Sequence, residues 1–194
     1  IIFNGDGYAD EWLEEAERRG LLNLPSLVDA APHMLDPKNI ALFEEFGVLN
    51  EAENHARYEV KLDTYSKLIN IEGQTMAHMA KRKIVPAVSD YADQVARTIN
   101  DKRAANPELE PTADLRLLKR LNDGANAMYD AIDALDAALA KAQAIEDTLD
   151  RARSYHDDVL GAMEDLRAIT DDMEGIVSTE AWPLPTYNKI LFYC

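Results

Sequence analysis

The sequence predicts an all-α protein: a bundle of long antiparallel helices, with short N-terminal helices before it and an irregular C-terminal tail after it. Two long stretches carry apolar residues at steps of three and four, the period of a helix with one buried face. The composition agrees, because alanine and leucine are abundant while aromatic residues make up only 7% of the 194 residues. The eight prolines and eight glycines are few for this length, and many lie near the ends.

Residues 1–48 form a connecting segment in this interpretation. Residues 1–4 are expected to end a strand, and a first helix is predicted over residues 10–19. Gly20 follows at the position where a glycine commonly terminates a helix. Residues 21–35 are expected to be irregular, because two prolines interrupt them.

A second short helix is predicted after this irregular stretch. Asp36 is a favourable N-cap residue, and Pro37 stands at the first helical position, where its missing N–H costs nothing. Gly47 is expected to end the helix.

The first long helix is predicted over residues 50–103, with Asn50 as its N-cap. Pro86 lies inside it and is expected to bend the helix without ending it, since the apolar pattern resumes at once. The predicted buried face consists of Tyr58, Leu62, Tyr65, Ile69, Met76, Ala80, Ile84, Val88, Tyr91, Val95 and Ile99.

A second long pattern follows a proline-containing turn at residues 104–112, with Thr112 as the expected cap. It continues to residue 178, and periodicity alone allows either one helix or a hairpin broken near residues 146–150. A compact domain favours the hairpin and therefore three long helices. The predicted buried face includes Leu121, Met128, Ile132, Leu135, Leu139, Ala142, Ala152, Tyr155, Val159, Leu166, Met173 and Ile176.

The division that follows is a connecting segment at 1–48, a long-helix bundle at 49–180 and a docking tail at 181–194. The tail is apolar and bracketed by prolines, and a free tail of that composition would expose too much apolar surface. We therefore expect it to dock on another part of the protein or on a neighbouring molecule, through Trp182, Pro183, Pro185, Tyr187, Leu191 and Phe192.

Charge and cysteine content restrict the class of protein. The formal net charge is −16, which disfavours binding to nucleic acid or to an anionic membrane surface. The single cysteine, Cys194, allows no internal disulfide and favours a reducing, cytoplasmic location. No apolar run approaches the roughly 20 residues that a membrane-spanning helix needs. A chain that begins at Ile1 suggests a fragment of a longer protein.

The opening stretch FNGDGYADEW resembles three kinds of ligand-binding loop and matches none of them. A dinucleotide-binding loop needs a glycine where Asp10 stands, and a calcium loop needs an oxygen ligand where Tyr8 stands. A phosphate-binding P-loop needs a Gly-Lys-Ser/Thr triplet, which the sequence lacks. A tight turn before a helix is the favoured interpretation.

The long helices carry no recognisable catalytic or metal-binding motif. None of the four histidines has an acidic residue three positions before it, as carboxylate-bridged metal sites in helical bundles require. There is no nucleophile motif of the form G-x-S-x-G. Glu72 and Gly73 interrupt the apolar face of the first long helix. We expect Gly73 to face the core, where another helix approaches closely, and Glu72 to face water.

Several long segments resemble the C-terminal region of type III glutamine synthetases. They are IIFNGDGYADEWLEEAERRGLLNL, then HARYEVKLDTYSKLINIEGQTMAHMAKRKIVPAVSDY, then HDDVLGAMEDLRAITDDME, and finally WPLPTYNKILF. Together they extend over the whole chain. Three features depart from the family pattern. Ala9 stands where a serine N-cap is expected, Gly161 stands where proline is usual, and an Arg or Lys is expected near His156.

The resemblance implies a parent enzyme that joins ammonia to glutamate, using ATP and Mg or Mn and passing through γ-glutamyl phosphate. It implies a homo-oligomer, a dodecamer in the family, and the catalytic domain of the same chain as a partner. The family's catalytic and metal-binding residues would lie before Ile1, so no catalytic, cofactor-binding or metal residue is assigned here. The alternative is an unrelated helical interaction or scaffold module, which the near-heptad pattern at 118–176 would also suit.

Overall fold

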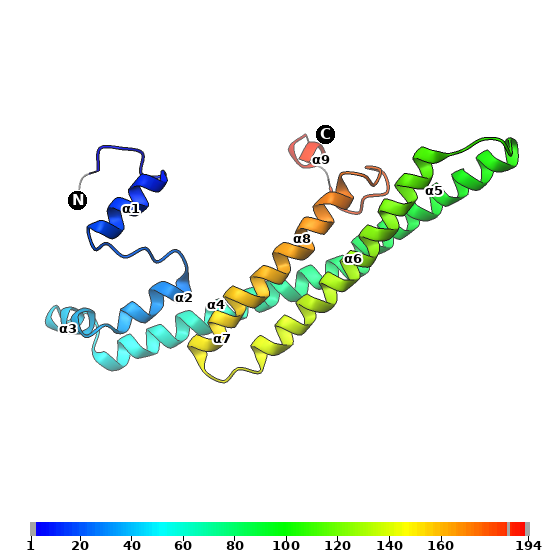
Figure 1. The fold of residues 1–194 in the computed structure, drawn as a ribbon. Helices are drawn as coiled ribbons and strands as arrows, with labels where there is room; N and C mark the ends of the chain where they lie inside the picture. Colours follow the sequence, from blue (N-terminus) through cyan, green and yellow to red (C-terminus); the bar gives the residue numbers. More distant parts are fainter. Residues whose placement is uncertain (1–2, 186, 193–194) are drawn as a thin grey trace. The chain divides into compact units, whose positions relative to one another are not determined.

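The computed structural model describes residues 3–185 and 187–192, with Tyr187 and Asn188 described by their backbone alone. All regular structure in these residues is helical, which confirms the predicted fold class (Figure 1). The described chain divides into two compact units whose boundary, Tyr65 to Ser66, falls within α4. The elements are α1 (Asp10–Arg18), α2 (Leu27–Ala30), the 3-10 helix η1 (Ala31–Leu35), α3 (Pro37–Glu45), α4 (Glu51–Met79), the π-helical turn η2 (Ala80–Ile84), α5 (Val85–Ala105), α6 (Thr112–Gln143), α7 (Thr148–Ser154), the π-helical turn η3 (Tyr155–Val159), α8 (Leu160–Glu174) and α9 (Tyr187–Leu191).

The first helix of the N-terminal unit ends as the sequence predicts. Gly20 has a φ of 70°, a conformation that glycine adopts without strain. Ala9 occupies the N-cap and provides no side-chain hydrogen bond. The strand expected at residues 1–4 is not supported, because Phe3 and Asn4 belong to no strand and the first two residues lie outside the described part.

The third helix also has the predicted limits, although its cap differs from expectation. Pro37 is the first helical residue, and Gly47 follows the helix with a φ of 64°. Asp36 occupies the N-cap position but gives no capping hydrogen bond. Its carboxylate instead lies 3.0 Å from Nδ1 of His33, on the preceding 3-10 helix.

The start of α4 is a reciprocal capping box. The Asn50 side chain accepts a hydrogen bond from the backbone N–H of Glu53 at 2.9 Å, and the Glu53 carboxylate accepts one from the N–H of Asn50 at 2.8 Å. Two backbone donors that a helix start leaves unpaired are thereby satisfied. The predicted cap at Asn50 is confirmed.

The long helix continues past Pro86 through a π-helical turn. The prediction placed the irregularity at Pro86 itself, but the hydrogen-bond pattern changes one turn earlier, in η2. Pro86 then falls in the first turn of α5, where a missing backbone donor is tolerated. Helices α4 and α5 are therefore joined by η2 without a loop.

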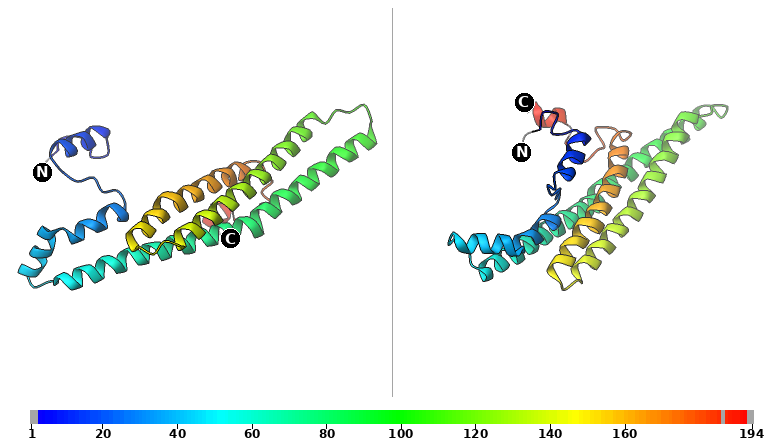
Figure 2. Two further views of the ribbon diagram at one scale, coloured as in Figure 1. Left: turned by 60° about the horizontal axis from the view of Figure 1, so that its bottom comes forward. Right: turned by 60° about the vertical axis from the view of Figure 1, so that its left-hand side comes forward.

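The second long helix, α6, runs antiparallel to α4 and α5 (Figures 1 and 2). Nζ of Lys102 lies 2.7 Å from Asp114 near the turn that joins them, and Nε2 of Gln143 donates to Asn70 at 2.8 Å at the other end. Thr112 does not cap α6 as predicted. It is the first helical residue, and Pro111 takes the N-cap position without a side-chain hydrogen bond.

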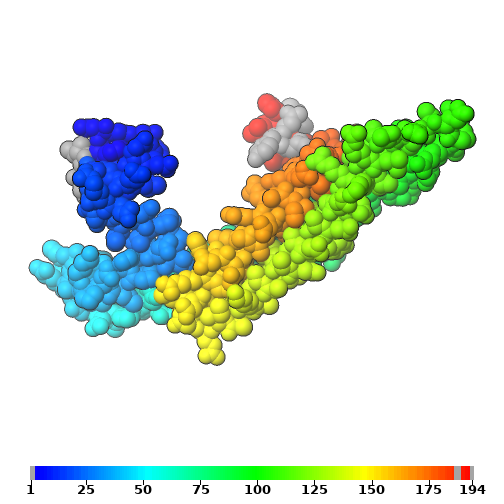
Figure 3. All heavy atoms as spheres, viewed as in Figure 1, coloured from blue at the N-terminus to red at the C-terminus, as the bar shows by residue number. Residues whose placement is uncertain are grey.

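The chain then reverses into a hairpin, which confirms the preferred alternative. Residues 144–147 separate α6 from α7 and overlap the start of the predicted break at 146–150. Asp147 caps α7 by accepting from the N–H of Asp150 at 2.9 Å. Helix α8 runs back along α6, as the views in Figures 2 and 3 show. Arg120 on α6 lies 2.5 Å from Asp172 on α8, which fixes the antiparallel register.

The core of the C-terminal unit follows the predicted apolar faces closely. Tyr91 and Met76, which were predicted to be buried, are half-buried. Val177 is buried instead of the predicted Ile176, because α8 ends at Glu174 and the helical spacing does not continue. The fully buried side chains of the long helices include Val88, Leu121, Met128, Ile132, Leu135, Val159 and Leu166.

Gly73 lies in this core, and Glu72 is exposed, both as predicted. A methyl group added at Gly73 would meet Cδ2 of Leu139 at 3.1 Å and Cγ1 of Val159 at 3.4 Å. The missing side chain therefore allows α4 to approach α6 and η3 closely. The three-part division of the chain at residues 48 and 180 stays a prediction.

Candidate functional site

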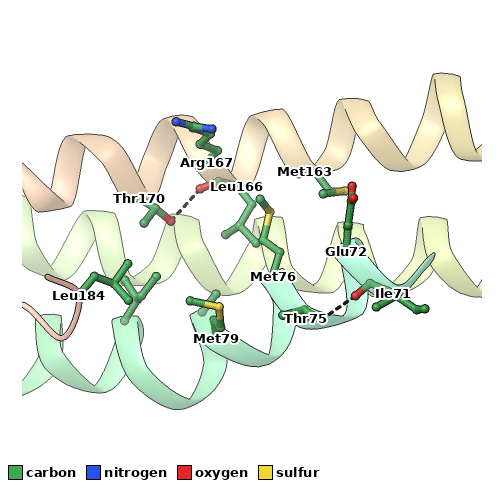
Figure 4. A pocket seen from close by; sticks show the side chains of 12 residues that line it. Ile71, Glu72, Thr75, Met76, Met79, Met163, Leu166, Arg167, Thr170 and Leu184 are labelled. Carbon is green, nitrogen blue, oxygen red and sulfur yellow. Dashed lines mark hydrogen bonds between the residues drawn. The ribbon is translucent and has the colours of Figure 1, made fainter. Parts of the chain in front are cut away.

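The best-formed concave site among the described residues of the C-terminal unit is an apolar groove between α4, η2 and α8. Its volume is about 500 Å³, and Leu184 from the tail closes one end. Figure 4 shows Leu184 at that end, and Ile71 and Glu72 at the other. We call this site the α4–α8 groove; it is lined by Ile71, Glu72, Thr75, Met76, Met79, Ala80, Ile84, Met163, Leu166, Arg167, Thr170 and Leu184.

Helical spacing explains why the walls of the groove are apolar. Met79, at the end of α4, and Ala80, at the start of η2, lie three and four residues after Met76. On α8, Leu166 lies three residues after Met163. Each set therefore faces one side of its helix. Methionine side chains are unbranched and polarizable, so they adapt to the shape of an apolar partner.

The two threonines of the groove direct their hydroxyl protons into their own helices. Oγ1 of Thr75 donates to the carbonyl of Ile71 at 2.7 Å, and Oγ1 of Thr170 donates to that of Leu166 at 2.8 Å. Both bonds are drawn in Figure 4. These hydroxyls are thus committed as donors, which leaves the groove with little hydrogen-bonding specificity for a polar ligand.

The two charged residues of the groove do not form a catalytic pair. Glu72 is exposed, and the Arg167 guanidinium is engaged by Asp171 one turn further along α8, with Nε 3.4 Å from the carboxylate. No base or nucleophile is desolvated between them. The groove is therefore suited to bind apolar side chains rather than to perform acid–base chemistry.

A polar cluster beside the groove ties three elements together. Oδ1 of Asn70 on α4 accepts hydrogen bonds from Nε2 of Gln143 on α6 at 2.8 Å and from the hydroxyl of Tyr155 on η3 at 3.2 Å. Tyr155 is 3% exposed, and its burial raises the pKa of its phenol. The cluster fixes the register of α4 against the hairpin that supplies the other wall.

The ion pairs of the bundle lie at its surface. Asp158 accepts from Lys141 and from the hydroxyl of Ser154, both at 2.8 Å, and these bonds hold its pKa below the ordinary value for aspartate. The pKa of Asp123 is lowered in the same way by Lys119, which lies one helical turn away. Such exposed pairs contribute little to stability and mark no active site.

The residues predicted to dock do not share one environment. Trp182 is buried at 6% exposure, whereas Pro183, Pro185, Leu191 and Phe192 are exposed. The side chain of Tyr187 lies outside the described part. Sequence reasoning missed the tail residue that enters the groove, Leu184, although its position between two prolines in an apolar tail was the available signal.

The Trp182 indole is unusual because its Nε1 has no hydrogen-bond partner among the described residues. A buried donor without an acceptor is costly, so most buried indoles find one. The backbone of Trp182 is fixed by a turn, in which its N–H donates to the carbonyl of Ser178 at 2.9 Å.

The described residues contain no group of three or more histidine, cysteine, aspartate or glutamate side chains placed to hold a metal ion. Across the same part of the chain, no helix has the length and apolar character needed to cross a bilayer.

Comparison with known proteins decides the family. The sequence model of the family described as glutamine synthetase C-terminal domain matches residues 1–103, just over half of the chain. The chain belongs to this family. The alternative of an unrelated helical scaffold module is therefore wrong.

Curated relatives extend the match beyond the glutamine synthetase C-terminal domain to nearly the whole sequence. A glutamine synthetase of Butyrivibrio fibrisolvens is 33% identical over 192 residues, and a type-3 glutamine synthetase of Dictyostelium discoideum is 30% identical over 196. A glutamine synthetase of Bacteroides fragilis is also 30% identical over 196 residues. Each alignment covers 99% of this chain but only 27% of the relative, so the chain spans about a quarter of their length.

Proposed function

We propose that the chain is the C-terminal helical part of a type III glutamine synthetase, an enzyme that ligates ammonia to glutamate at the expense of ATP. The observation that carries this proposal is the alignment of 99% of the chain with three glutamine synthetases. The part of the relatives that lies outside the alignment would hold the sites for ATP and for Mg or Mn. No residue of this segment is assigned to them.

Within that enzyme, we assign the segment a structural role. Its long helices are joined by packing at Gly73 and by the Asn70–Tyr155 hydrogen bond. The ion pair between Arg120 on α6 and Asp172 on α8 adds a contact at the surface. A rigid bundle of this kind supports assembly by presenting fixed surfaces. Its partners would be the catalytic domain of the same chain and further copies in a cytoplasmic homo-oligomer, with a dodecamer as the proposed form.

An exposed apolar position on α4 is our candidate assembly contact. Leu68 is 54% exposed and Ile71, one turn later, is 59% exposed. Neighbouring apolar side chains on one helical face are a common feature of surfaces that become buried in oligomers. The six tail residues named from the sequence are proposed to dock as well, with Trp182 as the anchor.

The assembly mass of the full-length protein tests this role. We expect Leu68→Glu to reduce the mass measured by sedimentation, because a charge at a buried interface loses its hydration. Gln94→Glu adds the same charge at an exposed site on α5 and should leave the mass unchanged. Equal masses for wild type and Leu68→Glu would show that Leu68 on α4 is not part of an assembly interface.

A further inference from the structure

We propose that the apolar C-terminal residues Ile190, Leu191 and Phe192 bind in the α4–α8 groove of their own chain. The tail would then act as a strap across α4 and α8. This inference rests on the docking role proposed for the tail, and it is independent of whether the full-length protein forms glutamine.

The tail carries large apolar side chains that are exposed to solvent. Ile190, Leu191 and Phe192 are 58%, 69% and 71% exposed, and they follow one another in the chain. Large exposed apolar patches on folded proteins mark binding surfaces or promote aggregation. Three such side chains in succession therefore favour a second, docked position.

The groove has the complementary chemistry. It holds about 500 Å³ of space lined mainly by apolar side chains, which lies within the range of sites that bind apolar ligands. Met76, Met79 and Met163 contribute to both walls, and Figure 4 shows them directed toward the space between α4 and α8. Adaptable methionines suit an aromatic side chain such as that of Phe192.

The tail already enters the groove at one end. Leu184 lines it beside the η2 end of α4, and Trp182, two residues earlier, is anchored by burial. The docked position would extend this existing contact along the groove. The occupant is thus the continuation of a segment that the groove already holds.

The length of the connection is sufficient. From Ile84 to Ile71 the groove follows 13 residues of α4 and η2, which is about 20 Å at 1.5 Å per residue. Three residues lead from Leu184 to Tyr187 and cover about 10 Å when extended. Helix α9 and Phe192 then add about 7 Å at 1.5 Å per residue, which together exceeds the roughly 12 Å of helix between Ile84 and Met76. Leu191 and Phe192 can therefore reach Met76 and Met163 without any movement of Leu184.

The short connection between Leu184 and Ile190 also favours docking of the tail within its own chain over docking in a second chain. A flexible connection of a few residues gives a local concentration in the millimolar range, and Leu184 of the same chain already holds the start of the tail at this groove. The groove should therefore be filled by the tail of the same chain rather than by that of a second copy.

The native Cys194, two residues after Phe192, provides a chemical probe of this position. In the full-length protein, with any cysteine outside residues 1–194 replaced, Met163→Cys places a thiol in the groove. Asp165→Cys places one on the exposed face of the same helix, two residues away, as a matched control. Mild oxidation followed by peptide mass spectrometry then measures the disulfide with Cys194.

We expect the disulfide to form at least about tenfold faster with Met163→Cys than with Asp165→Cys, because docking raises the local thiol concentration only in the groove. Adding Leu191→Ser and Phe192→Ser should lower the Met163→Cys rate to that of the control. Circular dichroism on each variant verifies that the helices are retained.

Two outcomes would overturn the proposal. Equal rates for the two cysteine positions would show that the tail has no preference for the groove. A mixture of isotopically labelled and unlabelled chains that yields mainly mixed disulfides would show that a second copy supplies the tail. Neither outcome depends on ATP-dependent glutamine formation, so failure here leaves the proposed enzymatic function open to its own test.

Discussion

The hydroxyl of Tyr155 donates a hydrogen bond to Oδ1 of Asn70 across 3.2 Å, joining residues that are 85 positions apart in the sequence. The same oxygen accepts from Nε2 of Gln143 at 2.8 Å. One amide oxygen therefore connects α4 to both arms of the hairpin. Buried polar groups of this kind fix a register that apolar packing alone leaves open.

Removal of the Tyr155 hydroxyl should destabilise the bundle modestly. We expect Tyr155→Phe to lower the free energy of unfolding by about 1 kcal/mol, since the ring is retained and one hydrogen bond is lost. Asn70→Ala should cost more, because it leaves the buried hydroxyl without that acceptor. Urea unfolding of both variants and of their combination measures the coupling, and strictly additive effects would contradict a direct bond.

The same phenol makes the stability of the bundle sensitive to alkaline pH. Burial raises the pKa of Tyr155 above its ordinary value of 10.0, although Arg151 and Gln143 act in the opposite direction. The folded state thus keeps its proton at a pH where the unfolded state has lost it. The contribution is complete below pH 10 and is lost as the pH rises through the folded-state pKa.

Tyr155→Phe provides the comparison for this pH effect. Thermal unfolding between pH 8 and pH 11 should show a steeper loss of stability for the wild type than for the variant. The other tyrosines are shared by both proteins, so the difference reports Tyr155 alone. Parallel pH profiles would mean that burial does not raise the pKa of this group.

Two glycines on helices should respond oppositely to the same substitution. Alanine is favoured over glycine in a helix interior by about 1 kcal/mol. At Gly73 the new methyl group meets Leu139 at 3.1 Å, and overpacking of this kind costs about 1–3 kcal/mol. Gly73→Ala should therefore be neutral to destabilising by up to about 2 kcal/mol.

Gly161 on α8 is the matched control, because a methyl group there meets nothing within 4 Å. Gly161→Ala should stabilise the protein by about 0.5–1 kcal/mol through helix propensity. Denaturant midpoints measured on the two variants give the comparison. Stabilisation by both substitutions would show that the helices around Gly73 are not closely packed.

Trp182 should matter through its bulk and not through its indole N–H. Trp182→Ala removes a large buried side chain and should cost about 3 kcal/mol or more. Trp182→Phe retains much of the ring and deletes a donor that has no partner among the described residues, so it should cost distinctly less. Thermal melts of the full-length protein compare them, and equal losses would indicate that the N–H is bonded in the full-length protein.

The helices were predictable because helical periodicity is a local property. The apolar faces of α5, α6 and α8 could be assigned from spacing alone, and the role of Gly73 followed from a glycine placed on such a face. The hairpin could be preferred only on grounds of compactness. Its capping residue, Asp147, lies within the predicted break and was not singled out.

Features that depend on contacts between distant residues could not be predicted. The π-helical turns η2 and η3 arise where one extra residue enters a helical turn, and no sequence signal marks them. The α4–α8 groove exists only because α8 folds back along the bundle and Leu184 returns to close it. The absent cap at Asp36 has a local cause, because its carboxylate lies 3.0 Å from Nδ1 of His33, three residues earlier.

The central claim is that this segment is a structural part of a glutamine synthetase whose chemistry resides elsewhere in the longer chain. The most direct test measures ATP-dependent glutamine formation from glutamate and ammonia, with Mg or Mn, by the full-length protein and by residues 1–194 alone. We predict activity in the full-length protein and none in the isolated segment. Glutamine formation by the segment alone, or none by the full-length protein, would contradict the claim.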